Sequence, residues 1–213
     1  MVCHVNVRRI WIGFAAAMAV GLGGAAQAAD VAAGKQAYAV CAACHGQQGE
    51  GNQAMNAPRL AGQEGWYLRR QMEAFQQGLR GTAKGDAFGA QMRPMAMAVT
   101  DPAALDNLIA YIGTLPDVPA EPTIQGDAAA GQKAYVVCAS CHGQKAEGLE
   151  QMGGPRLAGQ NDWYLVRQLH NYKSNLRGYD PKDIFGKQMQ PMANTLTSDQ
   201  AINDVVAYIN TLR

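Results

Sequence analysis

The residues best suited to chemistry are two clusters of cysteine and histidine. They read Cys41-Ala42-Ala43-Cys44-His45 and Cys138-Ala139-Ser140-Cys141-His142. Two thiols three positions apart lie on one face of a helical turn, where each can add to a vinyl group of a haem. The histidine that follows can then ligate the iron from one side. The pattern therefore predicts two covalently bound c-type haems (iron), with the four cysteines as attachment points and the two histidines as axial ligands.

Paired cysteines have three other common uses, namely a zinc knuckle, a redox-active dithiol and disulfide bonds. A zinc site would need further Cys or His residues nearby, but after the N-terminal segment only His170 lies outside the two motifs. A dithiol motif needs no following histidine and usually accompanies a βαβ pattern, which is absent here. Four cysteines in an exported chain would suggest two disulfides, but their placement before histidines favours haem.

The sequence is a tandem duplication. Residues 32–115 align without a gap to residues 129–212, with 44 identities in 84 positions and a constant offset of 97 residues. Segments with the sequences Pro-Arg-Leu-Ala-Gly-Gln and Trp-Tyr-Leu recur at this offset. A unit of this length in two copies is a repeated domain rather than a solenoid. We predict domains over 30–115 and 126–213, joined by a proline-punctuated linker over 116–125.

The N-terminus has the parts of a secretory signal peptide. Arg8 and Arg9 precede an uncharged run over 10–27, which ends in a small-x-small sequence before Asp30. We predict a signal peptide over 1–28, cleaved after Ala28, and hence export to the periplasm. The alternative is an uncleaved membrane anchor, because the run approaches the length that spans a bilayer.

Charge excludes one class of partner. The formal net charge of the whole chain is +1, and it contains no basic run. Nucleic-acid binding needs clustered Lys and Arg, so we expect no nucleic-acid partner.

Hydrophobic periodicity and capping residues predict an all-α fold of a few helices per copy. The first copy should contain helices from Asp30 to His45, over 64–77, and from an N-cap at Asp101. The last of these carries an apolar stripe at i, i+3, i+4, i+7 spacing, and the second copy repeats it behind a capping box of Thr197 and Gln200. Domains this small gain stability from a cofactor to bury, which agrees with the haem prediction.

The second axial ligand is predicted to be a methionine. Three pairs recur at the 97-residue offset, and they are Met55/Met152, Met92/Met189 and Met95/Met192. The first pair follows the histidine by only ten residues and so fits less well as a ligand on the opposite haem face, whereas the others lie in a predicted loop before the last helix. We favour Met92 and Met189, with Met95 and Met192 next, and soft core packing is the alternative for all of them. His170 is the alternative ligand in the second copy, but it aligns with Glu73 in the middle of a predicted helix, and we predict that it lies on a solvated helix face.

The chain resembles a dihaem cytochrome c of the cytochrome c4 family. The haem motifs, the Pro-Arg-Leu-Ala-Gly-Gln segments and the methionine segments before each final helix carry the resemblance, which extends over nearly all of the predicted mature chain. It implies Met92 and Met189 as the iron ligands. It also implies that each ligating imidazole donates from Nδ1 to a proline carbonyl, His45 to Pro58 and His142 to Pro155. Six side chains either line haem edges or meet propionates, or else are packing aromatics and solvated arginines: Trp66, Tyr67, Arg59, Trp163, Tyr164 and Arg156.

Irons ligated on both faces offer no site for a substrate, so we predict an electron carrier and not an enzyme. The resemblance implies respiratory-chain donors, such as a membrane cytochrome complex, and a terminal oxidase as acceptor. An alternative is the cytochrome subunit of a flavin- or molybdenum-containing periplasmic dehydrogenase. A dihaem peroxidase or thiosulfate-oxidising enzyme would need an open haem face, and the methionine segments disfavour it. A retained signal would add peripheral membrane association.

Overall fold

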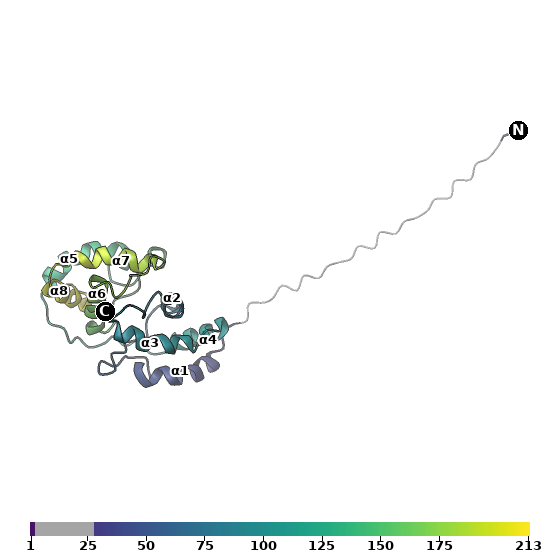
Figure 1. Ribbon diagram of the computed structural model, residues 1–213, viewed down its shortest axis with the longest axis horizontal. Coiled ribbons are helices and arrows are strands. Elements are labelled where there is room, and N and C mark those ends of the chain that lie inside the picture. The colour runs from purple at the N-terminus through teal and green to yellow at the C-terminus, as the bar shows by residue number, and fades with distance from the viewer. Residues whose placement is uncertain (3–27) are drawn as a thin grey trace.

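The computed structural model describes residues 1–2 and 28–213 (Figure 1). The predicted signal peptide falls mainly on residues 3–27, which lie outside the described residues. The helices of the first half are α1 (Val31–His45), α2 (Gly65–Gln76), α3 (Ala87–Met97) and α4 (Pro102–Ile112). Those of the second half are α5 (Ala128–His142), α6 (Asp162–Lys173), α7 (Ile184–Asn194) and α8 (Asp199–Ile209). Extended pairing over 28–213 is limited to two isolated bridges, so the all-α prediction is confirmed.

In each half the first and last helices cross at a glycine. A Cβ on Gly34 of α1 would overlap the backbone carbonyl of Asn107 in α4, and Gly131 of α5 meets Asp204 of α8 in the same way. Glycine is thus required for the close approach of the two backbones. The apolar stripes predicted for α4 and α8 form much of the buried core, together with Tyr38 and its counterpart Tyr135.

The helix ends follow the predicted caps with one exception. Asp30 caps α1 through its side chain, and Asp101 caps α4 with proline in its first turn, as predicted. The predicted capping box of α8 is wrong. Ser198 is the N-cap, and its hydroxyl accepts a hydrogen bond from the backbone N–H of Ala201.

The segments that carry the favoured methionines are helices, and the prediction that they are loops is wrong. Asp86 caps α3 by accepting from the N–H of Gly89, and Asp183 caps α7 equivalently. Each helix contains an internal proline, which removes one backbone donor but leaves the preceding turns intact. The proline in each helix is tolerated because the N-cap and the fully buried Ala96 and Ala193 hold the helices in place.

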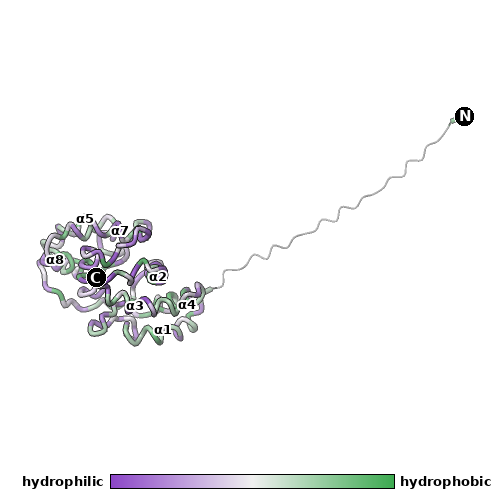
Figure 2. The backbone as a smooth tube through the Cα atoms, in the orientation of Figure 1, coloured by the Kyte–Doolittle hydropathy of each residue, from purple (hydrophilic) through white to green (hydrophobic). Residues whose placement is uncertain are grey.

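The two halves meet through α2 and α6, which lie on the sides facing one another (Figure 1). The linker between them is anchored by Asp162 of α6, which accepts hydrogen bonds from the backbone of Thr123 and Ile124. Apolar and polar residues are interleaved along the chain (Figure 2). Within the described ranges, no helix has the length and apolarity needed to cross a membrane.

Candidate haem sites

The Cys-x-x-Cys-His motifs lie at the C-terminal ends of α1 and α5. All four cysteines have free thiols and are partly exposed. Each helix ends at its histidine because the next residue is a glycine with positive φ, 86° at Gly46 and 85° at Gly143. The helical spacing keeps both thiols of a motif on one side, and the chain reversal leaves the imidazole facing the same cavity.

Each histidine is held in one tautomer. The Nδ1 of His45 lies 2.7 Å from the carbonyl oxygen of Pro58, and His142 has the same distance to Pro155. A carbonyl only accepts, so Nδ1 carries the proton and Nε2 keeps its lone pair. Burial lowers the pKa of both imidazoles, which favours the neutral form that binds iron. The predicted proline hydrogen bonds are confirmed.

Both motifs open on one continuous cavity of about 300 Å³. Methionine sulfur can reach it from both halves, because the lining includes Met55, Met92, Met95, Met152, Met189 and Met192. The side chain of Met95 is 41% exposed, whereas that of Met92 is less exposed and so better placed to reach a haem inside the cavity. His170 does not line the cavity and lies 3.9 Å from Asp199 on a partly solvated face, as predicted.

The donor set fits two haems. The cavity wall is mainly apolar, and it offers two thiols, one neutral imidazole and thioether sulfurs from each half. Across the part of the chain that the structure describes, no group of three or more His, Cys, Asp or Glu residues is arranged to hold a metal ion. That leaves the zinc interpretation without a ligand set.

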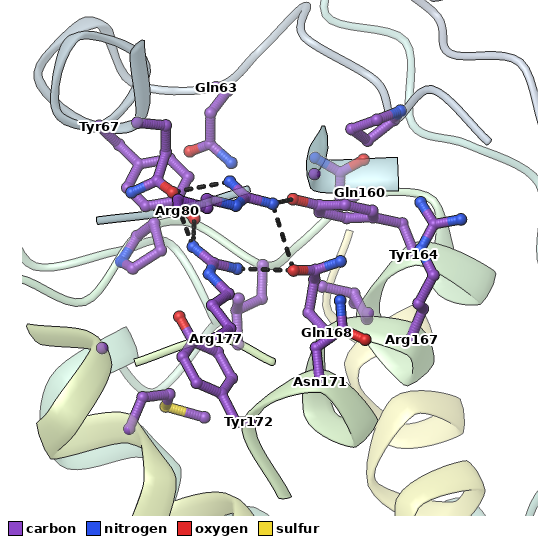
Figure 3. Close-up of a pocket in the computed structure, with 18 of the residues that line it drawn as sticks. Gln63, Tyr67, Arg80, Gln160, Tyr164, Arg167, Gln168, Asn171, Tyr172 and Arg177 are labelled. Atoms are coloured by element: carbon purple, nitrogen blue, oxygen red, sulfur yellow. Dashed lines mark hydrogen bonds between the residues drawn. The ribbon is translucent and has the colours of Figure 1, made fainter. Parts of the chain in front are cut away.

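The cavity is lined by a pair of arginines that sequence analysis missed, Arg177, which is buried, and Arg80, which is partly buried. Figure 3 shows the guanidinium groups of Arg80 and Arg177 side by side, next to Gln168. Both guanidiniums donate to the side-chain oxygens of Gln71 and Gln168. Arg177 also donates to the hydroxyl of Tyr67, at 2.9 Å. Within residues 28–213, no carboxylate forms a hydrogen bond with either guanidinium. Two neighbouring cations in a largely enclosed site, without an acidic partner, form a site suited to anions. The 97-residue offset between these arginines was the available signal in the sequence.

A second pair of arginines crosses between the halves. Arg70 of α2 donates to the carbonyl of Gly153 and lies 4.3 Å from the ring centroid of Phe185 in the second half. Arg167 of α6 reaches Asn56 and Phe88 in the first half in the equivalent way. Each half therefore supplies a cation to the other half's side of the cavity.

The six side chains with open roles fall into three equivalent pairs. Tyr67 and Tyr164 line the cavity, whereas the tryptophans stack on Arg70 and Arg167 instead. The interpretation of Arg59 as solvated is wrong, because it is only 3% exposed. Arg59 and Arg156 both bind the linker carboxylate of Asp117, at 2.7 and 2.6 Å, and so fasten the halves together.

Two all-helical units that each present Cys, Cys, His and Met to an apolar cavity define a tandem c-type cytochrome. Residues 31–116 and 128–213 both match the family model described as Cytochrome c, and the chain belongs to that family. Cytochrome c4 of Thiocapsa roseopersicina is 34% identical over 201 residues, covering 88% of this chain and 95% of that protein. The thiosulfate dehydrogenase electron acceptor of Stutzerimonas stutzeri is 30% identical over 179 residues, covering 79% and 76% respectively.

Solved structures agree with this assignment. The crystal structure of reduced recombinant cytochrome c4 from Pseudomonas stutzeri matches with a TM-score of 0.68 at 26% identity. The match covers 87% of this chain and 100% of that one. The protein is therefore a dihaem electron-transfer protein of the cytochrome c4 type, with two c-type haems, as the resemblance implied.

Proposed function

We propose that the protein is a periplasmic electron carrier and not an enzyme. In this proposal the two haem-binding domains are residues 30–115 and 126–213. A linker over 116–125 joins them, and the signal peptide over 1–28 is removed. In this proposal Cys41 and Cys44 hold one haem, and Cys138 and Cys141 hold the other. The observation that carries it is the single continuous cavity onto which both Cys-x-x-Cys-His motifs open.

The axial ligands in this proposal are His45 and Met92 in the first half, and His142 and Met189 in the second. Bound haem iron supplies one-electron oxidation and reduction, and thioether ligation favours the ferrous state. The chain's own contribution is to keep each imidazole neutral and oriented, and to surround the site with apolar side chains that exclude water. Two occupied axial positions leave none for a reagent.

The pair formed by Arg80 and Arg177 supports this assignment. Haem carries two propionate carboxylates, so two haems bring four anionic groups into a cavity whose arginines outnumber its acids. Arg177 is buried and Arg80 is partly buried, neither is hydrogen-bonded to a carboxylate among the described residues, and we assign both to propionates. This assignment replaces Arg59 and Arg156, whose guanidiniums are committed to Asp117.

A redox-titrated absorption spectrum of the periplasmic protein tests the ligand assignment. The weak long-wavelength band of an iron–sulfur bond should be lost in part from Met92→His, in part from Met189→His, and completely from the double variant. If the double variant keeps the band, Met95 and Met192 take over as ligands. Mass analysis that finds no covalently attached haem would reject the proposal as a whole.

The electron donor has two candidate classes. Respiratory-chain donors with a terminal oxidase as acceptor follow from the cytochrome c4 resemblance, and membrane association would follow from a retained signal. The similarity to a thiosulfate dehydrogenase electron acceptor favours a periplasmic dehydrogenase as a second donor class. Stopped-flow reduction of the purified protein by each class of donor separates them, because a physiological donor should reduce it in a salt-dependent, saturable manner.

A catalytic dihaem enzyme is the disfavoured alternative. An enzyme of this kind would need one haem with an open face, and such a haem binds carbon monoxide readily when reduced. We expect poor binding at both haems. Rapid stoichiometric binding of carbon monoxide by one haem of the unmodified protein would instead favour catalysis.

A further inference from the structure

The carbonyl that orients each histidine belongs to a peptide group whose other end is also bonded. Pro58 accepts from His45, and the N–H of the same peptide, on Arg59, donates to the Oδ1 of Asn161 at 2.7 Å. In the second half, the N–H of Arg156 donates to Glu64 Oε2 at 2.8 Å. A chain of two hydrogen bonds through one peptide therefore links each imidazole to a side chain of the opposite half.

Both reaching side chains depend on a glycine. A Cβ on Gly51 would overlap Asn161 Oδ1, and a Cβ on Gly148 would overlap Glu64 Oε1. These glycines have positive φ, 87° and 89°, and occupy equivalent positions in the repeat. Both copies therefore leave room at this glycine for a side chain from the opposite half. Only the entering side chain differs: the first half receives the neutral amide of Asn161, and the second half receives the carboxylate of Glu64.

The difference in charge changes the two histidines unequally. An amide N–H that donates to a carboxylate polarises its own carbonyl more strongly than one that donates to a neutral amide. The carbonyl then draws the Nδ1 proton of the imidazole more strongly and makes Nε2 a better electron donor to iron. More donation, together with one nearby negative charge, stabilises ferric over ferrous iron.

We propose that Glu64 and Asn161 are positioning residues that set the two haem potentials apart from across the junction between the halves. Glu64 lowers the potential of the haem bound by His142, and Asn161 leaves that of the His45 haem without this contribution. The proposal rests on the proposed function, since it requires His45 and His142 to ligate iron. The two copies thereby differ at a point where the rest of the hydrogen-bond chain is duplicated.

The expected size follows from Coulomb's law. In an effective dielectric near 20, a unit charge at a separation on the order of 10 Å changes a one-electron equilibrium by about ten- to twentyfold, and the partial exposure of Glu64 favours the lower value, about tenfold. A tenfold change in a one-electron couple corresponds to about 59 mV. Arg156 and Arg59 add little to the asymmetry, because both are paired with the same carboxylate of Asp117.

The test changes the charge of Glu64 and of Asn161, separately and together, in the full-length holoprotein. Glu64→Gln should raise the reduction potential of one component of the redox titration. The expected rise corresponds to an about tenfold change in the equilibrium constant of that one-electron couple. Asn161→Asp should lower the other component by a similar factor, and the double variant should show both shifts. The Met92→His and Met189→His spectra identify which component belongs to which half.

Two controls separate this effect from general charge or damage. Glu150→Gln removes a neighbouring acid that acts on Glu64 but does not bond the peptide, and it should shift neither component more than about twofold. The Nδ1–H proton resonance of His142 should move upfield in Glu64→Gln, as expected for a weaker hydrogen bond. Covalent haem content and the iron–sulfur band should be unchanged, and their loss in unmodified protein would instead count against the proposed function.

Unchanged potentials in both variants, or a shift of the same component by both, would overturn the inference. An equal shift from Glu150→Gln would also overturn it, because simple surface charge would then suffice. If Glu64→Gln fails to take up both haems, Asn161→Asp decides alone, since it leaves the hydrogen bond from Arg156 to Glu64 unchanged.

Discussion

Neutralising Asp117 should loosen the junction between the two halves. Its carboxylate is 46% exposed, but it binds Arg59, which is only 3% exposed, and Arg156 at the same time. A hydrogen bond to a charged group contributes about 1.5–3 kcal/mol, and the exposure of Asp117 places the Arg59 bond at the lower end. The more exposed Arg156 pair adds about 0.5 kcal/mol. Asp117→Asn should therefore lower the free energy of unfolding by about 2 kcal/mol.

The measurement is thermal unfolding of the oxidised holoprotein beside Asp106→Asn. Asp106 pairs with Arg69 on the surface of the first half only, so its loss should cost at most about 0.5 kcal/mol. For a chain of this size, about 2 kcal/mol corresponds to a fall in Tm of about 4–8 °C. Equal Tm values for the two variants would refute the argument that a buried arginine makes Asp117 special.

The same pair of variants predicts a pH dependence. The hydrogen bond from Arg59 holds the pKa of Asp117 below its usual value. A depressed carboxylate pKa stabilises the folded state above the unfolded value, near 3.9, and the contribution disappears as pH falls through the folded value. The stability gap between the unmodified protein and Asp117→Asn should be constant from neutral pH to about pH 5, and should close below about pH 4. A gap that persists in strong acid would contradict this assignment.

Three further changes probe the helix crossing, the motif and the arginine pair. Gly131→Ala should destabilise the second half by about 1–3 kcal/mol in denaturant unfolding, because its methyl overlaps a backbone carbonyl of α8. Tyr135→Phe should cost about 1–2 kcal/mol by the same measurement, since the carbonyl of Gly143 loses the hydroxyl that lies 2.8 Å away. Arg177→Gln should lower both haem potentials in a redox titration, because it removes a buried cation that opposes ferric iron; unchanged potentials would mean that the pair does not face the haems.

The haem motifs and the helices that carry them could be predicted because their signals are local. The Cys-x-x-Cys-His pattern needs only five neighbouring residues, and the stripe in α4 needs only two helical turns. The duplication strengthened both predictions by repeating them. Helices α3 and α7 were missed for the opposite reason, since their internal Pro94 and Pro191 are local signals against a helix that buried contacts outweigh.

The centre of the cavity could not be predicted, because it forms between segments about 100 residues apart. A repeat shows that Arg80 and Arg177 are equivalent, but it does not show how the two copies face one another. The same holds for Arg59, whose sequence neighbours do not indicate that it is buried or that it binds the linker carboxylate of Asp117. Contacts of this kind depend on the docking of two folded halves rather than on any periodicity within one.

A duplicated chain with near-twofold contacts can differentiate its two sites only where the duplication is broken. The cross-half bonds of Gln63 to the carbonyl of Arg156, and of Gln160 to that of Arg59, are equivalent and favour neither haem. Asp117 lies in the linker, outside the repeat, but it binds both Arg59 and Arg156 and so acts on both halves. Glu64 and Asn161 occupy equivalent positions in the repeat and bond equivalent peptides, yet carry different charge. We therefore expect this pair to contribute to the difference between the two haem potentials, because the proline carbonyls and the peptide N–H groups to which it is linked are equivalent in the two halves.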